Sequence, residues 1–462
     1  EAYSNRGIAL YELQRYDEAL LSYHNAISIK SDYAGAYWNL ALCHLLLGNL
    51  KDGWQGYEWR WKNKSIESYK SNRSFPQPLW LGAESLAEKT ILLHAEQGLG
   101  DTIQFCRYIP LVAQLGAQVI LEVQRPLLKL LKGLEGVSQI VALGDALPAF
   151  DYQCPLLSLP LAFKTELHTI PPIAQYITSD TDKVTKWQTK LGEKTKPRVG
   201  LVWSGSAEHK NDHNRSLTLS QLLSHLPSNI EYVCLQKEIR AIDKELLAQH
   251  TQIKYFGDAL EDFTDTAALC ELVDLVISVD TSVAHLAGTL GKPAWVLVTL
   301  TPDWRWLLER DDSPWYPSVK VYRQDKANDW NGVLDRARSD LEKRFDLSKY
   351  PPISPNSKLP NPVNSAPIQN QIALLIEQGL AFHRQGNFNE AQVLYEKILK
   401  IQANHFDALQ LLGTLFTQTK QSIKAIETLT KALQINPNHA ASYSNRGNAL
   451  KELQRYDEAL LS

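Results

Sequence analysis

The chain has 462 residues, 44% of them hydrophobic, with a formal net charge of −3 at pH 7. This length allows about three domains of about 150 residues each. The mixed charge disfavours non-specific nucleic-acid binding, which needs a concentrated basic face, and no apolar stretch approaches the ~20 residues of a membrane span.

Residues 1–64 contain two copies of a repeat with a 34-residue period, and the same period returns in residues 371–462. The matching residues are Gly7, Ala19, Tyr23 and Ala26 in the first copy, Leu40, Ala41 and Tyr57 in a looser second copy, and Gly379, Gly413, Gly447, Ala391, Ala425 and Ala459 near the other end. Small residues at these positions let two helices approach closely. The pattern resembles the tetratricopeptide repeat and predicts helical solenoid segments, each with a concave groove.

Asn5, Asn39 and Asn445 share one position on the first helix of their repeats. An asparagine that faces the groove can hydrogen-bond a peptide backbone without reading its side chains. The arrangement resembles the asparagine ladder of protein O-GlcNAc transferases, although Glu377 and Leu411 hold this position in two repeats. The sequence predicts a groove for a protein or peptide acceptor; a tolerated surface asparagine is the alternative interpretation.

Residues 2–22 and 442–462 are identical at 18 of 21 positions, so the chain stops in the middle of a repeat like the one that opens it. We interpret the chain as a fragment of a longer protein, with a recent duplication as the alternative. An unfinished terminal repeat leaves an apolar face without a neighbour, so we also expect self-association through this repeat.

An aromatic patch of Trp54, Tyr57, Trp59 and Trp61 ends the N-terminal repeats. A solvated helix would not carry three tryptophans, so we predict that this helix docks on the next domain. Residues 65–89 are predicted to form an extended connector.

From residue 90, apolar strands alternate with helices. The first unit, residues 90–195, has predicted strands at 91–95, 119–123 and 139–142. The second unit, residues 196–346, has predicted strands at 199–203, 232–235, 275–279 and 294–298. Such alternation predicts parallel sheets covered on both faces, with a cleft at the carboxyl ends of the strands. We predict a tight turn over 98–101, a helix over 102–115, and a linker rich in Pro, Ser and Asn over 347–370.

The segment Asp280-Thr281-Ser282-Val283 follows the buried strand 275–279 and opens a helix of small residues, with His285 one turn further on. The start of a helix offers free backbone N–H groups and the positive end of the helix dipole, which together bind phosphate. The alternative is an Asp or Thr N-cap, with His285 merely packed on the sheet. We predict that this segment binds a phosphate-bearing donor.

The central region resembles glycosyltransferases of the two-Rossmann GT-B type, close to the bacterial heptosyltransferases of glycosyltransferase family 9. The matching motifs are Gly100-Asp101, Trp203-Ser204-Gly205 and Asp280-Thr281-Ser282-Val283-Ala284-His285-Leu286-Ala287. With the repeats, the chain also resembles bacterial fusions of tetratricopeptide repeats and glycosyltransferases. The resemblance implies an α/β plus all-α fold class and transfer of a sugar from a nucleotide sugar, with inversion and without a metal or other cofactor.

The resemblance also implies roles for single residues. Residues 280–283 and His285 would hold the donor diphosphate, and Asp101 would be the general base, with His94 and Glu96 as nearby alternatives and an N-cap as the alternative role of Asp101. The further donor-binding residues that we expect at strand ends are Gly98, Gly100, Ser204, Gly205, Lys210, Arg215, Gln236, Lys237, Trp304 and Arg305. Cations would neutralise the diphosphate and aromatic rings would stack on base or sugar, whereas solvated loops are the alternative.

The sequence therefore predicts a glycosyltransferase whose repeats recruit a protein acceptor. A heptosyltransferase-like enzyme acting on a lipid-linked glycan, a non-catalytic repeat scaffold and a nucleotide-sugar epimerase are the alternatives. The five cysteines, Cys43, Cys106, Cys154, Cys234 and Cys270, show no metal-binding or redox spacing. We expect buried, reduced thiols and a cytoplasmic protein.

Overall fold

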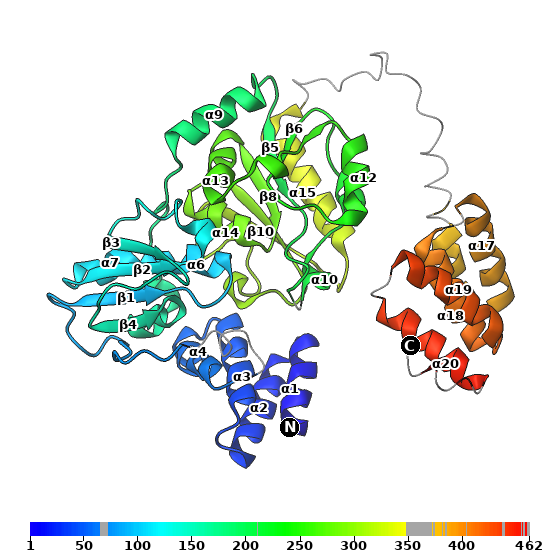
Figure 1. The fold of residues 1–462 in the computed structure, drawn as a ribbon, viewed down its shortest axis with the longest axis horizontal. Coiled ribbons are helices and arrows are strands. Elements are labelled where there is room, and N and C mark those ends of the chain that lie inside the picture. The colour runs from blue at the N-terminus through cyan, green and yellow to red at the C-terminus, as the bar shows by residue number, and fades with distance from the viewer. Residues whose placement is uncertain are drawn as a thin grey trace. The chain divides into compact units, whose positions relative to one another are not determined.

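The computed structural model describes residues 1–64, 73–209, 211–347 and 372–459, the last range without 373–374, 381, 384–385, 403, 437–438, 454 and 456–457. The chain divides into two compact units, Glu1–Ile353 and Ser354–Ser462. The first unit combines helix pairs with two parallel sheets, and the described part of the second unit is helical (Figure 1). The expected fold class, α/β with all-α repeat segments, is confirmed.

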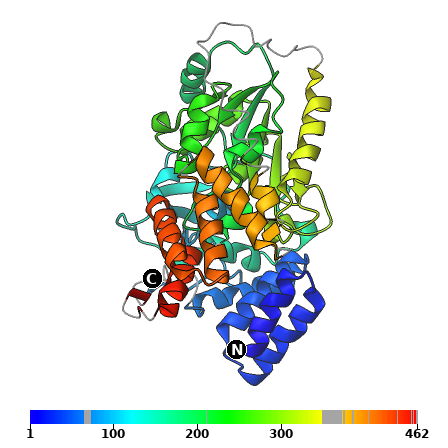
Figure 2. The same ribbon diagram turned by 90° about the vertical axis from the view of Figure 1, so that its right-hand side faces the viewer.

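Two helix pairs form the N-terminal repeats. The first pair is α1 (Ala2–Glu12) and α2 (Tyr16–Ile29), and the second is α3 (Ala34–Leu46) and α4 (Leu50–Tyr57), followed by the 3₁₀ turn η1 (Glu58–Trp61). Figure 2 shows these helices, in blue, from a second direction. A Cβ atom on Gly7 would lie 2.4 Å from the Tyr23 ring. The small residue at this repeat position therefore lets the two helices of a pair touch.

The second unit repeats this arrangement around a core of its own. Its helices are α17 (Phe388–Ile401), α18 (Phe406–Gln418), α19 (Ser422–Ile435) and α20 (Ala440–Glu452). A Cβ atom on Gly413 would lie 2.5 Å from the Leu429 side chain. Tyr395, Leu412 and Leu429 belong to one buried apolar cluster. Helical repeats at both ends of the chain are confirmed.

The first sheet contains β1 (Thr90–His94), β2 (Gln118–Val123), β3 (Val137–Ala142) and β4 (Tyr152–Pro155), all parallel, in the order β3-β2-β1-β4. Its helices and 3₁₀ turns are α6 (Leu99–Phe105), η2 (Cys106–Tyr108), α7 (Ile109–Gln114), η3 (Arg125–Leu127), η4 (Leu156–Ser158), α8 (Leu159–Ala162) and η5 (Leu167–Thr169). The three predicted strands are confirmed to within two residues, whereas β4 was not predicted.

Two predictions about the segment after β1 are wrong. Residues 99–101 are the first turn of α6 and not a separate turn, because Gly98 is the N-cap and its N–H is bonded by the Asp101 carboxylate. The predicted helix over 102–115 is interrupted by η2. Pro110, at the start of α7, has no N–H to donate, so the helical hydrogen-bond ladder cannot run through it unbroken.

The second sheet has the order β10-β9-β8-β5-β6-β7, again all parallel. Its strands are β5 (Arg198–Val202), β6 (Glu231–Cys234), β7 (Ile253–Lys254), β8 (Leu275–Val279), β9 (Ala294–Val298) and β10 (Val319–Arg323). Its helices and turns are α9 (Thr181–Leu191), α10 (Asp212–Arg215), α11 (Leu219–Leu223), α12 (Ala241–Gln249), η6 (Gly257–Ala259), α13 (Phe263–Leu272), α14 (Ser282–Thr289), η7 (Trp304–Trp306) and α15 (Trp330–Phe345). The four predicted strands are confirmed, and β7 and β10 were not predicted.

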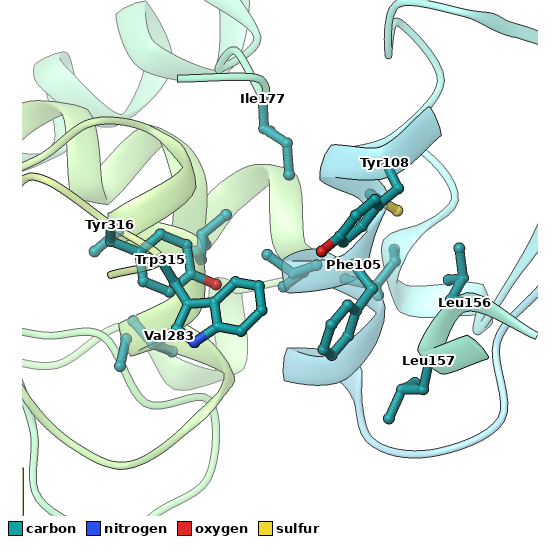
Figure 3. Packing of buried hydrophobic residues seen from close by; sticks show 14 of the residues in the cluster. Phe105, Tyr108, Leu156, Leu157, Ile177, Val283, Trp315 and Tyr316 are labelled. Carbon is teal, nitrogen blue, oxygen red and sulfur yellow. The ribbon is translucent and has the colours of Figure 1, made fainter. Parts of the chain in front are cut away.

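One buried apolar cluster runs through the N-terminal repeats, the first sheet and one face of the second sheet. Figure 3 shows Phe105 and Tyr108 on one side of this packing and Val283, Trp315 and Tyr316 on the other. A second cluster, with Leu201 and Trp330, covers the opposite face of the second sheet. The two sheets and the N-terminal repeats therefore form one packed body.

The predicted docking of the aromatic patch is confirmed for two of its four residues. Trp54 and Tyr57 are each 2% exposed, and the Trp54 ring lies 5.3 Å from the ring of Trp304. Trp59 stacks on Tyr37 at 3.9 Å and Trp61 faces Arg60, so these two rings pack against residues of the repeat segment.

Helices α6 and α14 meet where Gly100 faces His285. A Cβ atom on Gly100 would lie 2.7 Å from His285 Cδ2 and 3.3 Å from Ser282 Cα. His285 is buried and Ser282 Cα is backbone, so neither can give way freely. This contact requires glycine.

We predict that Gly100→Ala lowers the free energy of unfolding by about 1–3 kcal/mol, because it overpacks the contact between α6 and α14. Gly133→Ala is the control, since a Cβ atom there meets no atom within 4 Å. Urea denaturation followed by tryptophan fluorescence measures both. Equal effects of the two substitutions would contradict the tight contact.

None of the described helices is long and apolar enough to cross a membrane. All five cysteines are buried and none forms a disulfide, as expected.

Candidate functional site

The site begins at the point where the strand order of the second sheet reverses. β5 and β8 are neighbours, but the chain continues from β5 towards β6 and from β8 towards β9. Their loops therefore diverge, and such a divergence leaves a crevice beyond the carboxyl ends of the strands. Val202 pairs with Ser278, so Trp203 and Asp280 leave the sheet at nearly the same level. Arg215 Nη1 donates to the Asp280 carbonyl oxygen at 3.0 Å and joins the two loops.

The N-terminus of α14 lies at this point of divergence. Thr281 is the N-cap residue, but no side chain caps the helix, and Thr281 Oγ1 pairs with Ser278 Oγ at 3.0 Å instead. The Ala284 N–H is bonded to the Thr281 carbonyl. Among the described residues, the N–H groups of Ser282 and Val283 have no acceptor. Two backbone donors at the positive end of a helix therefore stay available to an anion.

His285 lies beneath this N-terminus and is 5% exposed. Its Nδ1 pairs with the Tyr316 hydroxyl at 2.9 Å, and its ring stacks on Trp306 with 5.5 Å between centroids. Burial, helped by the charge of Arg305, lowers the pKa of His285 to about 3. A neutral imidazole therefore packs between α14 and the loop after β9.

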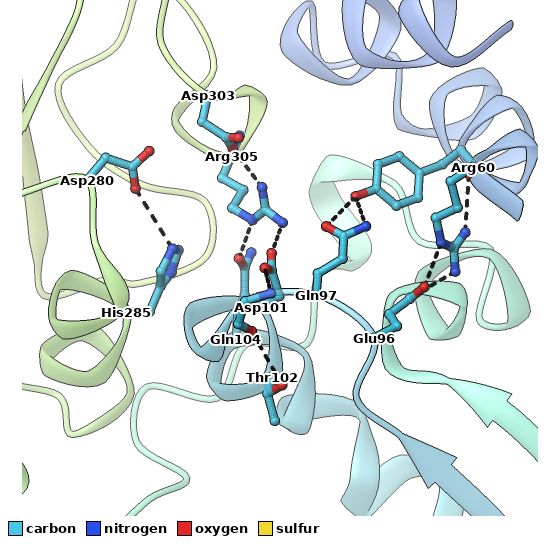
Figure 4. A network of polar contacts seen from close by, with 12 residues as sticks. Arg60, Glu96, Gln97, Asp101, Thr102, Gln104, Asp280, His285, Asp303 and Arg305 are labelled. Atoms are coloured by element: carbon cyan, nitrogen blue, oxygen red, sulfur yellow. Dashed lines mark hydrogen bonds and ion pairs between the residues drawn. The ribbon is translucent and has the colours of Figure 1, made fainter. Parts of the chain in front are cut away.

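Arg305 connects the two sheets through polar contacts. Its guanidinium donates to Gln104 Oε1 at 2.9 Å and to Asp303 Oδ1 at 2.8 Å, and it forms an ion pair with Asp101. Figure 4 shows Arg305 reaching from the loop after β9 towards Asp101 and Gln104 on α6. The guanidinium also lies over the Trp304 ring at 4.1 Å. The second oxygen of Asp101 accepts the Gly98 N–H at 2.8 Å, so Asp101 is held by Arg305 and by the Gly98 backbone.

Asp280 and Asp303 have opposite protonation tendencies. Burial and then the nearby Asp303 charge raise the pKa of Asp280 to about 6, against the opposing charges of Arg215 and Arg305. Burial also disfavours ionised Asp303, but the Arg305 guanidinium outweighs this effect and lowers the pKa of Asp303. Asp303 is therefore charged at neutral pH, whereas Asp280 titrates close to pH 6.

Several buried donors around Asp280 have no hydrogen-bond partner among the described residues. They are Gln104 Nε2, Arg215 Nε and Trp306 Nε1. The Trp306 indole N–H lies close enough to the Asp280 carboxylate to offset part of the rise in the pKa of Asp280. Its distance and angle do not meet the criteria for a hydrogen bond, so Trp306 Nε1 has no partner. The ion-paired oxygen of Asp212 lies 3.7 Å from Arg215 Nε, which is too long for a hydrogen bond. Buried donors without partners cost free energy, so such a group of donors indicates a bound ligand or ordered water.

The loop after β5 is held by Gln236. Its Oε1 accepts the Trp203 N–H at 2.7 Å, and its Nε2 donates to Ser204 Oγ at 3.0 Å. A Cβ atom on Gly205 would lie 2.6 Å from Arg215 Nη2, so Gly205 makes room for that guanidinium. Ser204, Gly205, Arg215 and Gln236 thus come together as predicted, while their binding role stays a prediction.

Lys237 and His94 are bonded to residues other than those around Asp280. Lys237 is exposed and donates to the Glu261 carbonyl at 3.1 Å. Lys210 lies outside the described residues. His94 Nε2 pairs with Gln153 Oε1 at 3.0 Å, and burial lowers the pKa of His94 to about 4.

Glu96 is engaged by the repeat segment and not by the group around Asp280 (Figure 4). Arg60 donates to both its oxygens at 2.9 Å, to Ser158 Oγ at 2.7 Å and to Glu58 Oε1 at 2.6 Å. The side chains of Arg60 and Glu96 are 0% and 1% exposed. Burial raises the pKa of Glu96 against the opposing charge of Arg60, but both carboxylate oxygens are buried and bonded to Arg60, so a substrate hydroxyl does not reach them.

The three predicted groove asparagines lie on the first helices of their repeats. Asn5 is exposed on α1, Asn39 is half-buried on α3, and Asn445 on α20 donates to Thr414 Oγ1 at 2.9 Å. The bond from Asn445 shows that this position can also join two repeats. Their predicted contact with a peptide stays a prediction.

Sequence reasoning missed four residues of the site: Gln104, Asp303, Trp306 and Arg240. Arg240 forms an ion pair with Asp212 and donates to the Gly205 carbonyl at 3.2 Å. The spacing of Gln104, three residues after Asp101 on one helix face, was an available signal. Among the described residues, no group of three or more His, Cys, Asp and Glu side chains is arranged to hold a metal ion.

Comparisons with known proteins match both kinds of segment. A TPR repeat family model matches residues 7–48, and the model of anaphase-promoting complex, cyclosome, subunit 3 matches residues 384–461. Protein FlbA of Caulobacter vibrioides is 27% identical over an alignment of 371 residues that covers 74% of this chain. The match covers 61% of that relative, so the chain spans about three fifths of its length.

Two solved glycosyltransferases are similar to the central region in fold. The family 9 glycosyltransferase from Veillonella parvula is 10% identical, with 58% of this chain and 99% of that chain covered and a TM-score of 0.42. The ADP-heptose lps heptosyltransferase II of E. coli is 12% identical, with 56% and 99% covered and a TM-score of 0.41.

We predict that Arg60→Met destabilises the protein by about 3–5 kcal/mol, because it leaves Glu96 buried without a counter-charge. Arg60→Met combined with Glu96→Gln is expected to recover part of this loss. Arg125→Met is the control, because its ion pair with Asp145 is exposed and is expected to be worth less than about 1 kcal/mol. Urea denaturation measures the three variants, and a loss for Arg60→Met no larger than the control's would contradict the buried pair.

Proposed function

We propose that this protein is a glycosyltransferase that transfers a sugar from a nucleotide sugar to a protein recruited by its repeats. One observation carries the proposal: donors without a partner lie at the uncapped N-terminus of α14 and on three side chains that contact Asp280 or Arg305. They are the N–H groups of Ser282 and Val283 and the side-chain donors of Gln104, Arg215 and Trp306. Such a set suits the diphosphate of an activated sugar.

In this proposal the N–H groups of Ser282 and Val283 hold the diphosphate, and Arg215 neutralises part of its charge. As the acceptor oxygen forms a bond to the anomeric carbon, the bond from that carbon to the diphosphate oxygen breaks. The leaving diphosphate takes up the electron pair, and the fixed donors stabilise the growing charge. Displacement from the opposite face inverts the anomeric configuration.

Asp101 is the proposed acceptor of the proton that the acceptor hydroxyl loses. Of the three predicted bases, Glu96 is paired with Arg60 and His94 with Gln153, which leaves Asp101. Asp101 lies on α6, where it faces Arg305. One Asp101 oxygen is bonded to the Gly98 N–H, and the other faces Arg305. When the diphosphate attracts Arg305, this second oxygen becomes available to the hydroxyl.

The repeats supply the proposed acceptor specificity. Asn5 on α1 and Asn39 on α3 are at least partly exposed, so their amides can reach a peptide backbone. A peptide bound through its backbone would be held with little dependence on its side chains. This favours a protein acceptor over a lipid-linked glycan.

Binding of UDP, GDP, ADP and CDP by the full chain, measured by isothermal titration calorimetry, tests the proposal. We expect one of these to bind and Arg215→Gln to weaken it about tenfold or more, because a charge-assisted hydrogen bond is lost. Arg338→Gln is the control, because Arg338 pairs with Glu342 on the surface of α15. A protein that binds none of the four would favour the scaffold alternative, and sugar on glycolipid but on no co-expressed protein would favour the lipid-linked acceptor.

We also expect nucleoside-diphosphate binding to strengthen as the pH falls from neutral towards about 6, and this contribution of Asp280 to level off below that pH. The pKa of Asp280 is already raised in the free protein, and a bound anion raises it further, so binding takes up a proton. The change is at most about tenfold per pH unit for one proton. Asp280→Asn removes this proton uptake, whereas titration of the nucleotide phosphate remains. Calorimetry from pH 5 to 8 gives the slope of log Kd against pH for the wild type and for the variant. Identical slopes would contradict the role of Asp280.

A further inference from the structure

The N-terminal repeats are bonded to both sides of the proposed donor crevice. On the side of the first sheet, Tyr57 and Arg60 contact Gln97 and Glu96, the two residues that precede the N-cap Gly98. On the side of the second sheet, Gln14 Nε2 donates to the Leu300 carbonyl at 2.9 Å. The repeats therefore hold both walls of the crevice at once.

The same segment fills the place where the strand order of the first sheet reverses. β1 has β2 on one side and β4 on the other, so the loops that follow β1 and β4 diverge beyond their carboxyl ends. Arg60 bridges these two loops, because it bonds Glu96 after β1 and Ser158 after β4. A buried guanidinium from the repeats thus occupies the position at which an open parallel sheet usually admits a ligand.

These bonds set the position of α6. Gln97 is held by the Tyr57 hydroxyl, at 3.3 Å from Oε1 and 3.2 Å from Nε2, and the Gln97 carbonyl accepts from Gln124. Gly98 follows directly, and the first turn of α6 carries Asp101, which faces Arg305. Figure 4 shows Gln97 beside Asp101, and the Arg305 guanidinium pointing towards Asp101 from the loop after β9.

We propose that Tyr57 and Arg60 are positioning residues of the donor site, and that the N-terminal repeats and this site form one coupled element. This inference rests on the proposed function of the crevice. The hydroxyl of Tyr57 and the guanidinium of Arg60 fix residues 96–98, and these residues fix Asp101 against Arg305 and α14. A chain segment bound on the repeats then changes nucleotide affinity, and a bound nucleotide changes affinity for that segment by the same factor.

Tyr57→Phe is the variant that isolates this effect. It keeps the ring that packs near Trp304 and removes only the hydroxyl that holds Gln97. The fold is retained, so a change in nucleotide affinity reports on position and not on unfolding. Tyr37→Phe is the matched control, because Tyr37 stacks on Trp59 within the same repeat and has no bond to residues 96–98.

The experiment measures binding of UDP, GDP, ADP and CDP to the full-length chain, its Tyr57→Phe and Tyr37→Phe variants, and Gln14→Ala, by calorimetry, together with their melting temperatures. We expect Tyr57→Phe to weaken nucleotide binding about fivefold while the melting temperature stays within a few degrees, since only the two hydrogen bonds between the Tyr57 hydroxyl and the Gln97 amide are lost. Gln14→Ala is expected to weaken it less, and Tyr37→Phe not at all.

The outcomes separate the two proposals. Binding by the wild type with equal affinity in Tyr57→Phe overturns the coupling and leaves the proposed function standing. Equal weakening in Tyr57→Phe and Tyr37→Phe also overturns the coupling, because it indicates a general effect of the repeat. Absence of binding in every protein overturns the proposed function, and the coupling with it.

Discussion

The ion pair between Arg305 and Asp101 is the contact on which the arrangement of the site depends. It joins residues 204 positions apart in the chain and brings α6 of the first sheet to the loop that follows β9 of the second. Removing a guanidinium from water is costly unless hydrogen bonds and opposite charge compensate, and here Asp101, Gln104 and Asp303 supply both. The two sheets are thus held in one relative orientation by charge as well as by the apolar packing beneath.

Arg305 also influences the protonation states of the carboxylates around it. Arg305 holds Asp303 in its charged form, and Asp303 in turn makes Asp280 a weaker acid. The site therefore contains an arginine that can exchange one carboxylate for a phosphate, beside a carboxylate that can become neutral when an anion arrives. His285 takes no part in this exchange of charge, because burial keeps its ring neutral.

The sequence predicted elements well where one local signal was strong. β8 and β9 are continuous apolar runs buried on both faces, and both were predicted with their observed bounds. β7 has only two residues, too few for any periodicity to show, and β4 contains Gln153 and Pro155, so it does not form a continuous apolar run. Residues 280–285 could be singled out as a candidate site because a buried strand leads directly into a helix of small residues. Asp101, Glu96 and Arg305 were also predicted as site residues, but the pairing of Arg305 with Asp101 and of Arg60 with Glu96 was not, because these residues meet only through tertiary packing. Sequence spacing carries no information on such pairs without an alignment.

The apolar cluster that the N-terminal repeats share with both sheets has a consequence for how the molecule melts. In a free solenoid each repeat is stabilised only by its nearest neighbours, so the solenoid can unfold from one end. Here Tyr23 and Trp54 of the repeats belong to the same cluster as Leu93 and Leu121 of the first sheet. Fraying of the first repeats would therefore open the interior of the α/β region as well.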